Sequence, residues 1–417
     1  MTATDSQLGR AYAGYDRTAP VHATAKYLPE HRRHGVALCL SGGGFRATLF
    51  HLGALRRLNE LGVLARLTTV TSVSGGSIMA ARLATALTWP LSGPIPSDRW
   101  DTLITRPIRD FTRRNRRTTP ILERLKPWNW TKEDTAVRAL AEVYERDLTG
   151  ATLADLPDSP RFVFCATDMA FGVNWVFEKS RMGDYQAGYV SPPPADWPLA
   201  RAVAASSCFP PIFNPMKVHV PAARYAGGMF PAGKQRDECL SDLRLTDGGN
   251  YDNLGLEPVW KDHATVLVSD GGGTFDFGPD SGLAQRLMRY TAIVDNQARS
   301  LRKRWLISNF LARLLEGAYW GVGSSPLAYD DPNAPGYSKA LAAEVIAEVR
   351  TDLNEFSDAE AAVLENHGYL LADAAIRRHV PGLLRGELPE VTVPHPEWMD
   401  EARVRSALRN SHKRKIL

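Results

Sequence analysis

The chain has 417 residues, of which 44% are hydrophobic and 23% are charged, and its formal net charge is +4. This is the composition of a globular protein with a sizeable core, and it excludes a collagen-like or a disordered chain. The small net charge gives no support to a nucleic-acid partner.

The cysteines and the apolar runs indicate the cellular location of the protein and whether it binds a metal. Cys39, Cys165, Cys208 and Cys239 are widely spaced and include no CxxC pair, which argues against a zinc site or a disulfide framework. The chain does not open with a basic-then-apolar signal pattern, and it lacks a run of about 18 apolar residues that could span a bilayer. We therefore expect a cytoplasmic protein without metal or cofactor, any membrane contact being peripheral.

Strands and helices alternate after a polar N-terminal arm, residues 1–34. Residues 35–40 (GVALCL) form a short apolar run that glycines end, which is typical of a buried strand, and residues 46–61 place leucines at helical spacing. Residues 67–72 and 77–87 repeat the strand and the helix. Strand–helix–strand–helix at this density predicts a parallel sheet covered by helices.

The later parts of the chain are less regular. The proline- and arginine-rich residues 88–135 predict an insertion over one end of the sheet. Further strands are expected at 161–167, 173–177 and 265–269, and a short helix at 199–206. We assign 35–275 to one catalytic domain, 276–393 to a helical part packed on it and 394–417 to a basic tail. A capping box at 357–360 predicts a helix start in the helical part.

Ser74 is the first candidate for catalysis. It lies in SVSGG, residues 72–76, between an expected strand and an expected helix. A sharp turn of this kind projects a nucleophilic serine above the end of a parallel sheet. Ser72 stands where the usual G-x-S-x-G pattern has its first glycine, and a turn that merely begins a helix is the alternative interpretation.

The glycine run Gly42, Gly43 and Gly44 is the second candidate. Consecutive glycines let backbone N–H groups point into one concavity at a helix N-terminus, which suits a phosphate or a developing oxyanion. The nucleotide-binding pattern G-x-x-x-x-G-K-[ST] is absent, so an oxyanion hole is the better functional interpretation, and a tight turn is the structural one. Arg46 follows, and its guanidinium could brace this loop or contact a substrate phosphate.

The general base is expected to be Asp247, which follows an expected strand and precedes two glycines. No histidine lies in a loop after the later strands, as a Ser-His-Asp triad would require. An aspartate can activate a serine directly in a dry site, which makes a dyad. A simple β-turn is the alternative for this segment.

Taken in order, these segments resemble the patatin-like phospholipases. The matching segments are SGGGFR at 41–46, SVSGGS at 72–77, ASSCFPPIF at 205–213 and TDGGNYDNLG at 246–255. The resemblance covers about residues 35–275. The GGG-x-Arg-Ala version of the first segment also resembles the cytosolic phospholipases, and Ala47 stands where patatins usually have glycine.

The resemblance implies a three-layer α/β/α fold with a mostly parallel central sheet and a helical C-terminal part. It implies that Ser74 is the nucleophile, Asp247 its partner and residues 42–44 the oxyanion hole, with Arg46 beside it. The implied activity is hydrolysis of acyl esters of glycerophospholipids. A neutral-lipid or small-ester hydrolase, an acyltransferase on the same dyad, and a non-enzymatic lipid-binding protein are the alternatives.

A lipid hydrolase must meet its substrate at an interface, and two segments are candidates for contact with an anionic membrane. Residues 301–320 combine basic and aromatic side chains in what we expect to be one amphipathic helix. The arginines of 106–117, with Trp128 and Trp130, form the second candidate. An ordinary helix that packs its leucines inward is the alternative for 301–320.

Overall fold

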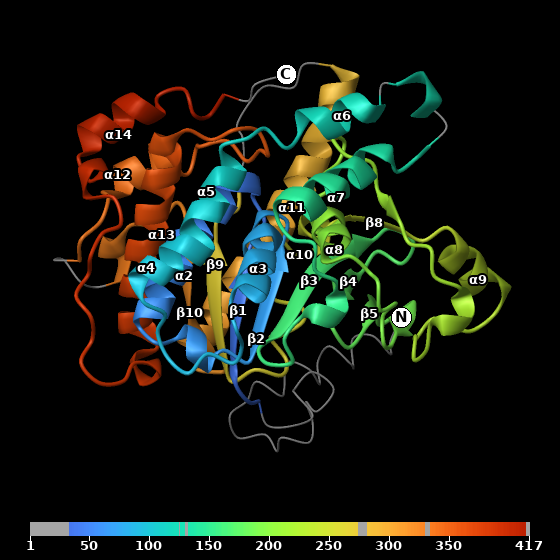
Figure 1. Cartoon of the computed structure of the whole chain (residues 1–417), viewed down its shortest axis with the longest axis horizontal. Coiled ribbons are helices and arrows are strands. Elements are labelled where there is room, and N and C mark those ends of the chain that lie inside the picture. Colours follow the sequence, from blue (N-terminus) through green and yellow to red (C-terminus); the bar gives the residue numbers. More distant parts are fainter. Residues whose placement is uncertain (1–32, 125, 130–131, 274–281, 330–333, 414–417) are drawn as a thin grey trace, which may run out of the picture.

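The computed structural model describes residues 33–124, 126–129, 132–273, 282–329 and 334–413 (Figure 1). Almost all of the N-terminal arm, Trp130 and the last four residues of the basic tail lie outside the described residues. A mixed sheet crosses the described part of the chain, and helices cover both of its faces (Figure 1). The expected three-layer α/β/α fold is confirmed.

The sheet is parallel where Ser74 and the glycine run lie. Its strands are β1 (Val36–Leu40), β2 (Thr69–Val73), β3 (Arg161–Asp168), β4 (Asn174–Phe177), β5 (Met182–Asp184), β6 (Gly188–Val190), β7 (Met216–Lys217), β8 (Arg244–Asp247), β9 (Thr265–Asp270) and β10 (Glu316–Gly321). Neighbours in the order β10-β9-β1-β2-β3 pair in parallel, and β4, β5 and β6 continue the sheet with antiparallel pairing. The loops that follow β1, β2 and β9 therefore meet at one edge of the sheet. Strand β8, which carries Asp247, instead pairs antiparallel with β3.

Hydrophobic clusters pack on both faces of the sheet. The helices are α2 (Gly44–Glu60), α3 (Gly75–Ala86), α4 (Ser97–Trp100), α5 (Arg106–Thr112), α6 (Thr118–Arg124), α7 (Thr135–Asp147), α8 (Leu199–Ser206), α9 (Lys234–Ser241), α10 (Gly249–Asp252), α11 (Leu283–Leu311), α12 (Lys339–Leu341), α13 (Asp358–His379) and α14 (Glu401–Leu408). Because side chains alternate along a strand, Leu38 packs in the core with α2, α3 and α13, whereas Cys39 packs in the core with Leu306 of α11.

The expected helix over 301–320 is wrong. α11 ends at Leu311, and Glu316–Gly321 forms β10, which extends the sheet parallel to β9. Trp320 is fully buried in the core and cannot face a membrane. A short apolar and aromatic run fits a strand as well as a helix, and only the pairing with β9 distinguishes them. The helical part of the chain therefore also contributes a strand to the sheet.

Four arginines of the insertion form ion pairs with other parts of the molecule. Arg109 and Arg113 reach Asp358, Arg116 pairs with Asp147, and Arg117 pairs with Asp352. Arg116 and Arg117 are both buried. These ion pairs connect the insertion to the rest of the domain, and they leave less of its charge for a membrane than the sequence suggested.

The C-terminal part packs on the domain through α13, whose N-terminus carries the expected capping box at Ser357 and Glu360. α13 lies directly against α2, with Gly53 of α2 facing the backbone of Glu365. Glycine permits this approach because a Cβ atom there would overlap the neighbouring carbonyl group.

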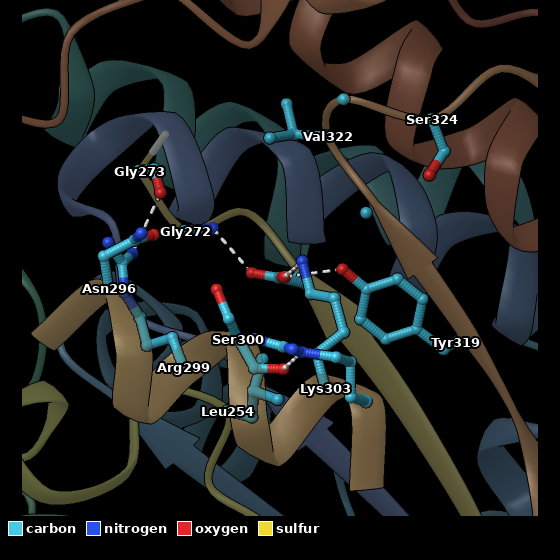
Figure 2. A pocket seen from close by; sticks show the side chains of 14 residues that line it. Leu254, Gly272, Gly273, Asn296, Arg299, Ser300, Lys303, Tyr319, Val322 and Ser324 are labelled. Atoms are coloured by element: carbon cyan, nitrogen blue, oxygen red, sulfur yellow. Dashed lines mark hydrogen bonds and ion pairs between the residues drawn. The ribbon is translucent and has the colours of Figure 1, made fainter. Parts of the chain in front are cut away.

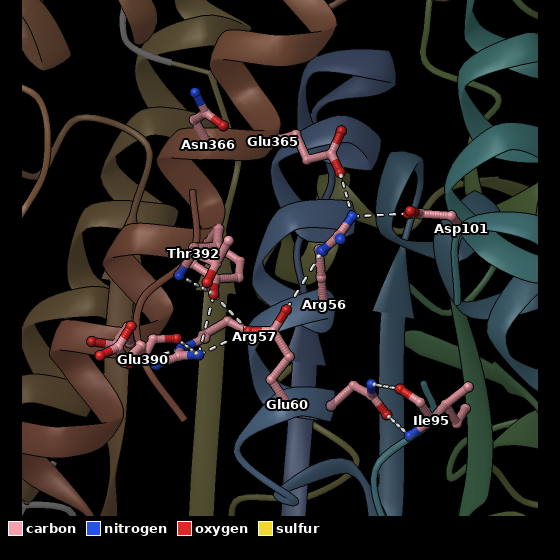
Figure 3. A network of polar contacts seen from close by, with 12 residues as sticks. Arg56, Arg57, Glu60, Ile95, Asp101, Glu365, Asn366, Glu390 and Thr392 are labelled. Atoms are coloured by element: carbon pink, nitrogen blue, oxygen red, sulfur yellow. Dashed lines mark hydrogen bonds and ion pairs between the residues drawn. The ribbon is translucent and has the colours of Figure 1, made fainter. Parts of the chain in front are cut away.

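Arg57 of α2 is the centre of a polar network between these helices (Figure 3). The side chain is fully buried, and its Nε donates to Asp373 at 2.8 Å. Its Nη1 donates to Glu60 at 2.8 Å and to the carbonyl oxygen of Glu390 at 3.1 Å. A buried guanidinium requires such partners, so the network fixes how α2 sits against the C-terminal part.

Candidate active site

Ser74 occupies the sharp turn between β2 and α3, with a φ of 50° and a ψ of −116°. A non-glycine residue in this conformation is strained, as nucleophilic serines in strand-to-helix turns are. Its backbone N–H donates to Ser206 Oγ at 2.9 Å, and Ser206 Oγ also lies 2.8 Å from Ser77 Oγ. α8, which carries Ser206, therefore holds the turn. The sequence had placed Ser206 in a matching segment without giving it this role.

Ser72, which replaces the usual glycine, fits the turn because its hydroxyl is satisfied. Ser72 Oγ donates to the carbonyl oxygen of Val163 at 3.2 Å and accepts from Ser77 Oγ at 3.0 Å. Ala47, the other departure from the family pattern, faces Gly271, where a Cβ atom would lie 2.6 Å from Ala47 Cα. The glycine that this close approach requires is thus on the opposing loop.

Asp247 reaches Ser74 through the pairing of the strands. Val73 of β2 pairs with Cys165 of β3, and Asp247 of β8 pairs with the next residue, Ala166. The opposite edge of β3 is occupied by β4 over the same residues, so β8 lies on the edge that β2 leaves. Asp247 is therefore next to the turn that carries Ser74.

The environment of Asp247 makes its carboxyl group basic. The side chain is 2% exposed, and its Oδ1 accepts from the N–H of Gly249 at 2.7 Å. Burial raises the pKa of Asp247 to about 7, although hydrogen bonds from Gly249 and the Ser74 hydroxyl lower it. Among the described residues, Oδ2 is buried and has no partner of normal hydrogen-bond geometry. This oxygen is placed to accept a proton.

The glycine loop follows β1 and faces Ser74. Gly43 has a φ of 140° and Gly44 a φ of 56°, which side chains rarely permit, and both residues line the same pocket as Ser74. Among the described residues no acceptor is found for either N–H group. Gly42 differs, because its N–H donates to the carbonyl oxygen of Asn253 at 3.0 Å. Gly43 and Gly44 are thus the donors available to an oxyanion.

Arg46 lies in the first turn of α2 and is 2% exposed. Its guanidinium donates to the carbonyl oxygens of Gly271 at 3.2 Å, Ala347 at 2.5 Å and Val349 at 2.8 Å. These contacts tie the glycine loop to the loop after β9 and to the C-terminal part. They fit the first of the two roles considered for Arg46, a brace of the loop.

The pocket above Ser74 and Asp247 has a volume of about 270 Å³. Phe209, Ile212 and Phe213, which follow α8, give it an apolar wall. Arg117 from the insertion and Arg299 from α11 also line it. The sequence did not predict the last two, because nothing local marks a residue that only the tertiary fold brings to the site.

Histidine does not take part in this pocket among the residues that the structure describes. His51 is buried between Ser269 and the carbonyl oxygen of Ser41, and burial lowers its pKa to about 4. His263 contacts Thr69 at the other end of β2. The described geometry therefore brings an aspartate, and not a histidine, to the serine.

A strained serine at a strand-to-helix turn, a buried carboxyl group beside it and glycine N–H groups thus lie together at one pocket of the α/β fold. The family model of the patatin-like phospholipases matches residues 38–260, more than half of the chain, and the chain belongs to this family.

Several solved structures are similar to the chain. Human GIVD cytosolic phospholipase A2 aligns with 12% identity and a TM-score of 0.44, over 91% of this chain and 63% of that one. The same protein in complex with methyl gamma-linolenyl fluorophosphonate aligns with 14% identity and a TM-score of 0.46, over 91% and 59%. VipD from Legionella pneumophila aligns with 14% identity and a TM-score of 0.36, over 84% and 67%. This chain thus spans less than two thirds of the human protein.

No curated protein sequence matches the chain. In the described part of the structure, none of the helices combines the length and the apolar character needed to cross a bilayer.

Proposed function

We propose that the protein hydrolyses carboxylic esters of glycerophospholipids, in the manner of a phospholipase A, by means of a Ser74–Asp247 dyad. The observation that carries this proposal is the position of the buried Asp247 carboxyl group beside the strained turn of Ser74, in one pocket with Gly43 and Gly44. Burial tunes the carboxyl group to the range in which a general base works at neutral pH.

In the first half of the reaction, Ser74 Oγ attacks the ester carbonyl carbon and its proton passes to Asp247 Oδ2. The N–H groups of Gly43 and Gly44 stabilise the oxyanion of the tetrahedral intermediate. When the intermediate collapses, the carbon–oxygen bond to the lysolipid breaks, and Asp247 returns the proton to the leaving oxygen. An acyl-Ser74 ester remains.

In the second half, water attacks the acyl-Ser74 ester and gives its proton to Asp247. Collapse of the new intermediate releases the fatty acid, and the proton returns to Ser74 Oγ. The apolar wall of Phe209, Ile212 and Phe213 supports an acyl chain as the group that lies in the pocket.

The proposal includes peripheral contact with a lipid surface through α11. Ala292, Asp295 and Arg299 line the catalytic pocket, whereas Val294 and Leu301, which are seven residues apart, share the opposite face of the helix. Val294 is 68% exposed and Leu301 58% exposed. An exposed apolar face on a helix that borders the pocket suits an interfacial enzyme.

Labelling with a fluorophosphonate probe tests the dyad. The wild-type protein should be labelled, whereas Ser74→Ala should not be, and Asp247→Asn should be labelled far more slowly. Ser97→Ala, which removes an exposed serine on α4, is the matched control and should be labelled like the wild type. Labelling that survives Ser74→Ala would overturn the mechanism, and a wild-type protein that reacts with no probe would favour a lipid-binding protein.

A further inference from the structure

A second pocket lies beside the catalytic one and has a volume of about 610 Å³ (Figure 2). α11 forms one wall with Asn296, Arg299, Ser300 and Lys303, and the loop after β10, which includes Ser324, lies opposite (Figure 2). Gly273 and Arg299 line both pockets, so the two hollows adjoin. Whatever occupies the second pocket is next to the group that reacts at Ser74.

Asp270, the carboxylate that lines this second pocket, is paired with a lysine. Lys303 Nζ lies 2.9 Å from Asp270 Oδ2, and the Tyr319 hydroxyl donates to the same oxygen at 2.6 Å. Burial raises the pKa of Asp270, but the Lys303 ammonium and the hydrogen bonds from Tyr319 and Gly272 bring it well below its ordinary value. Asp270 is therefore ionised, and the ammonium group of Lys303 offsets its negative charge.

Positive charge remains after this pairing. Arg299 lies 3.2 Å from Asp295, on the catalytic side, and donates to the carbonyl oxygen of Gly273 at 2.9 Å. Arg304 donates to the carbonyl oxygen of Ser300 in its own helix, at 3.3 Å, and among the described residues it has no carboxylate partner. Of the cations that line the hollow, Lys303 is paired with Asp270 and Arg299 with Asp295, so Arg304 carries the charge that no carboxylate of the described residues offsets.

The catalytic pocket offers no comparable excess of positive charge. Its Arg117 pairs with Asp352, and its Arg299 is the residue that it shares with the second pocket. Arg46, which the sequence offered as a phosphate contact, is buried against backbone carbonyl oxygens. An anionic group on a bound molecule therefore finds its most favourable position in the second pocket.

We propose that this second pocket, lined by Arg299, Lys303 and Arg304 together with Asn296, Ser300 and Ser324, binds a phosphate group. Guanidinium groups bind phosphate oxygens in pairs, and amide and hydroxyl groups supply further donors. The inference rests on the proposed function, in which the adjoining pocket holds the acyl ester. The phosphate belongs either to the head group of the lipid whose ester lies in the catalytic pocket or to a free phosphate ligand.

The binding experiment uses the full chain with Ser74→Ala, so that no substrate is consumed. Inorganic phosphate and glycerol 3-phosphate are titrated by calorimetry at low ionic strength, where exposed charges are least screened. Both should bind, and Arg304→Gln should weaken them at least about tenfold, equivalent to about 1.4 kcal/mol. Arg99→Gln, an exposed arginine of α4 that lines neither pocket, removes the same charge and should leave the affinity unchanged.

The substrate experiment separates the two sources of the phosphate. It compares kcat/KM for a phospholipid and for an uncharged ester with the same acyl chain, in the wild type and in Arg304→Gln. If the ratio of the two values falls, the pocket holds the head group of the substrate. If the ratio is unchanged while the affinity for inorganic phosphate falls, the pocket holds a free phosphate ligand.

The proposal is overturned if neither phosphate compound binds the Ser74→Ala protein and the ratio is the same in both enzymes. Binding that persists in both Arg304→Gln and Arg304→Glu would also overturn it, because the anion would then lie elsewhere. A wild-type protein that hydrolyses neither ester would count against the proposed function, and the calorimetry would still decide on the pocket.

Discussion

Val73 and Asp247 pair with consecutive residues on the same edge of β3: Val73 pairs with Cys165, and Asp247 pairs with Ala166. Ser74 follows Val73 directly, so the registers of β2 and β8 against β3 set the distance between Ser74 and Asp247, the two residues of the proposed dyad. A register shift of one residue would turn the Asp247 side chain to the other face of the sheet. The relative position of Ser74 and Asp247 is therefore fixed by the strand pairing of the sheet.

The rate should depend on the ionisation of Asp247. Because burial raises its pKa to about 7 and the base must be deprotonated, kcat/KM should fall as the pH drops below that value. Each pH unit below it should lower kcat/KM about tenfold, with a plateau above it. Initial rates across the pH range measure this, and a profile that stays flat through pH 7 would exclude Asp247 as the base.

Asp247→Asn should stabilise the fold above neutral pH. The folded-state pKa is raised from 3.8 to about 7, so the wild type loses stability as the pH rises between these values. At about 1.4 kcal/mol per pH unit, the variant should gain at most about 4 kcal/mol in free energy of unfolding. The gain should vanish below the ordinary pKa of 3.8. Thermal unfolding of both proteins as a function of pH measures it, and an equal gain at acid pH would contradict this origin.

Gly43→Ala should abolish most of the activity. A Cβ atom at this φ of 140° would meet the carbonyl oxygen of Gly271 at 2.5 Å and displace the loop. Removing one oxyanion donor costs about 100-fold or more in kcat. Gly62→Ala is the matched control, since Gly62 also has a positive φ but faces open space. It should cost about 1–2 kcal/mol of stability from backbone strain and leave kcat unchanged. Equal kinetic effects of both variants would contradict the role of Gly43.

Ser206→Ala should slow the reaction through Ser74 without weakening substrate binding. It removes the acceptor for the Ser74 N–H and leaves a buried donor unsatisfied, which costs about 1–3 kcal/mol of stability. We expect kcat to fall about tenfold with KM unchanged, since the loss affects the orientation of the nucleophile. Ser325→Ala removes another buried hydroxyl group, bonded to Tyr337, and should lower stability alone. A change in KM without a change in kcat would count against the positioning role.

Replacing the exposed apolar side chains of α11 by serine should weaken binding to anionic vesicles. Val294, Leu301 and Leu311 are 68%, 58% and 81% exposed, and burying them in the interface should stabilise the bound state. We expect the triple variant to lower vesicle partitioning by about tenfold or more. Leu327→Ser, 55% exposed and outside α11, is the control. Vesicle sedimentation measures the partitioning, and equal partitioning of all the proteins would exclude α11 as the contact.

Local sequence patterns were sufficient for the elements whose signals are local. The apolar run of 35–40 and the leucine spacing of 46–61 became β1 and α2, and the helix at 199–206 became α8 with the same bounds. Glycine spacing and short polar turns carry information about backbone conformation within a few residues. They are therefore enough to predict the turns that hold Ser74 and Asp247.

Tertiary structure decided whatever depends on partners distant in the chain. β10 is a strand because β9 offers it an edge, although its sequence alone suits the end of an amphipathic helix. Arg46 is a brace because the carbonyl oxygens of Ala347 and Val349 reach it, some 300 residues away. The sequence thus determined which residues have reactive or permissive chemistry. Only the fold decided which of them meet, because the burial and the charges that set their roles come from segments that no local pattern connects.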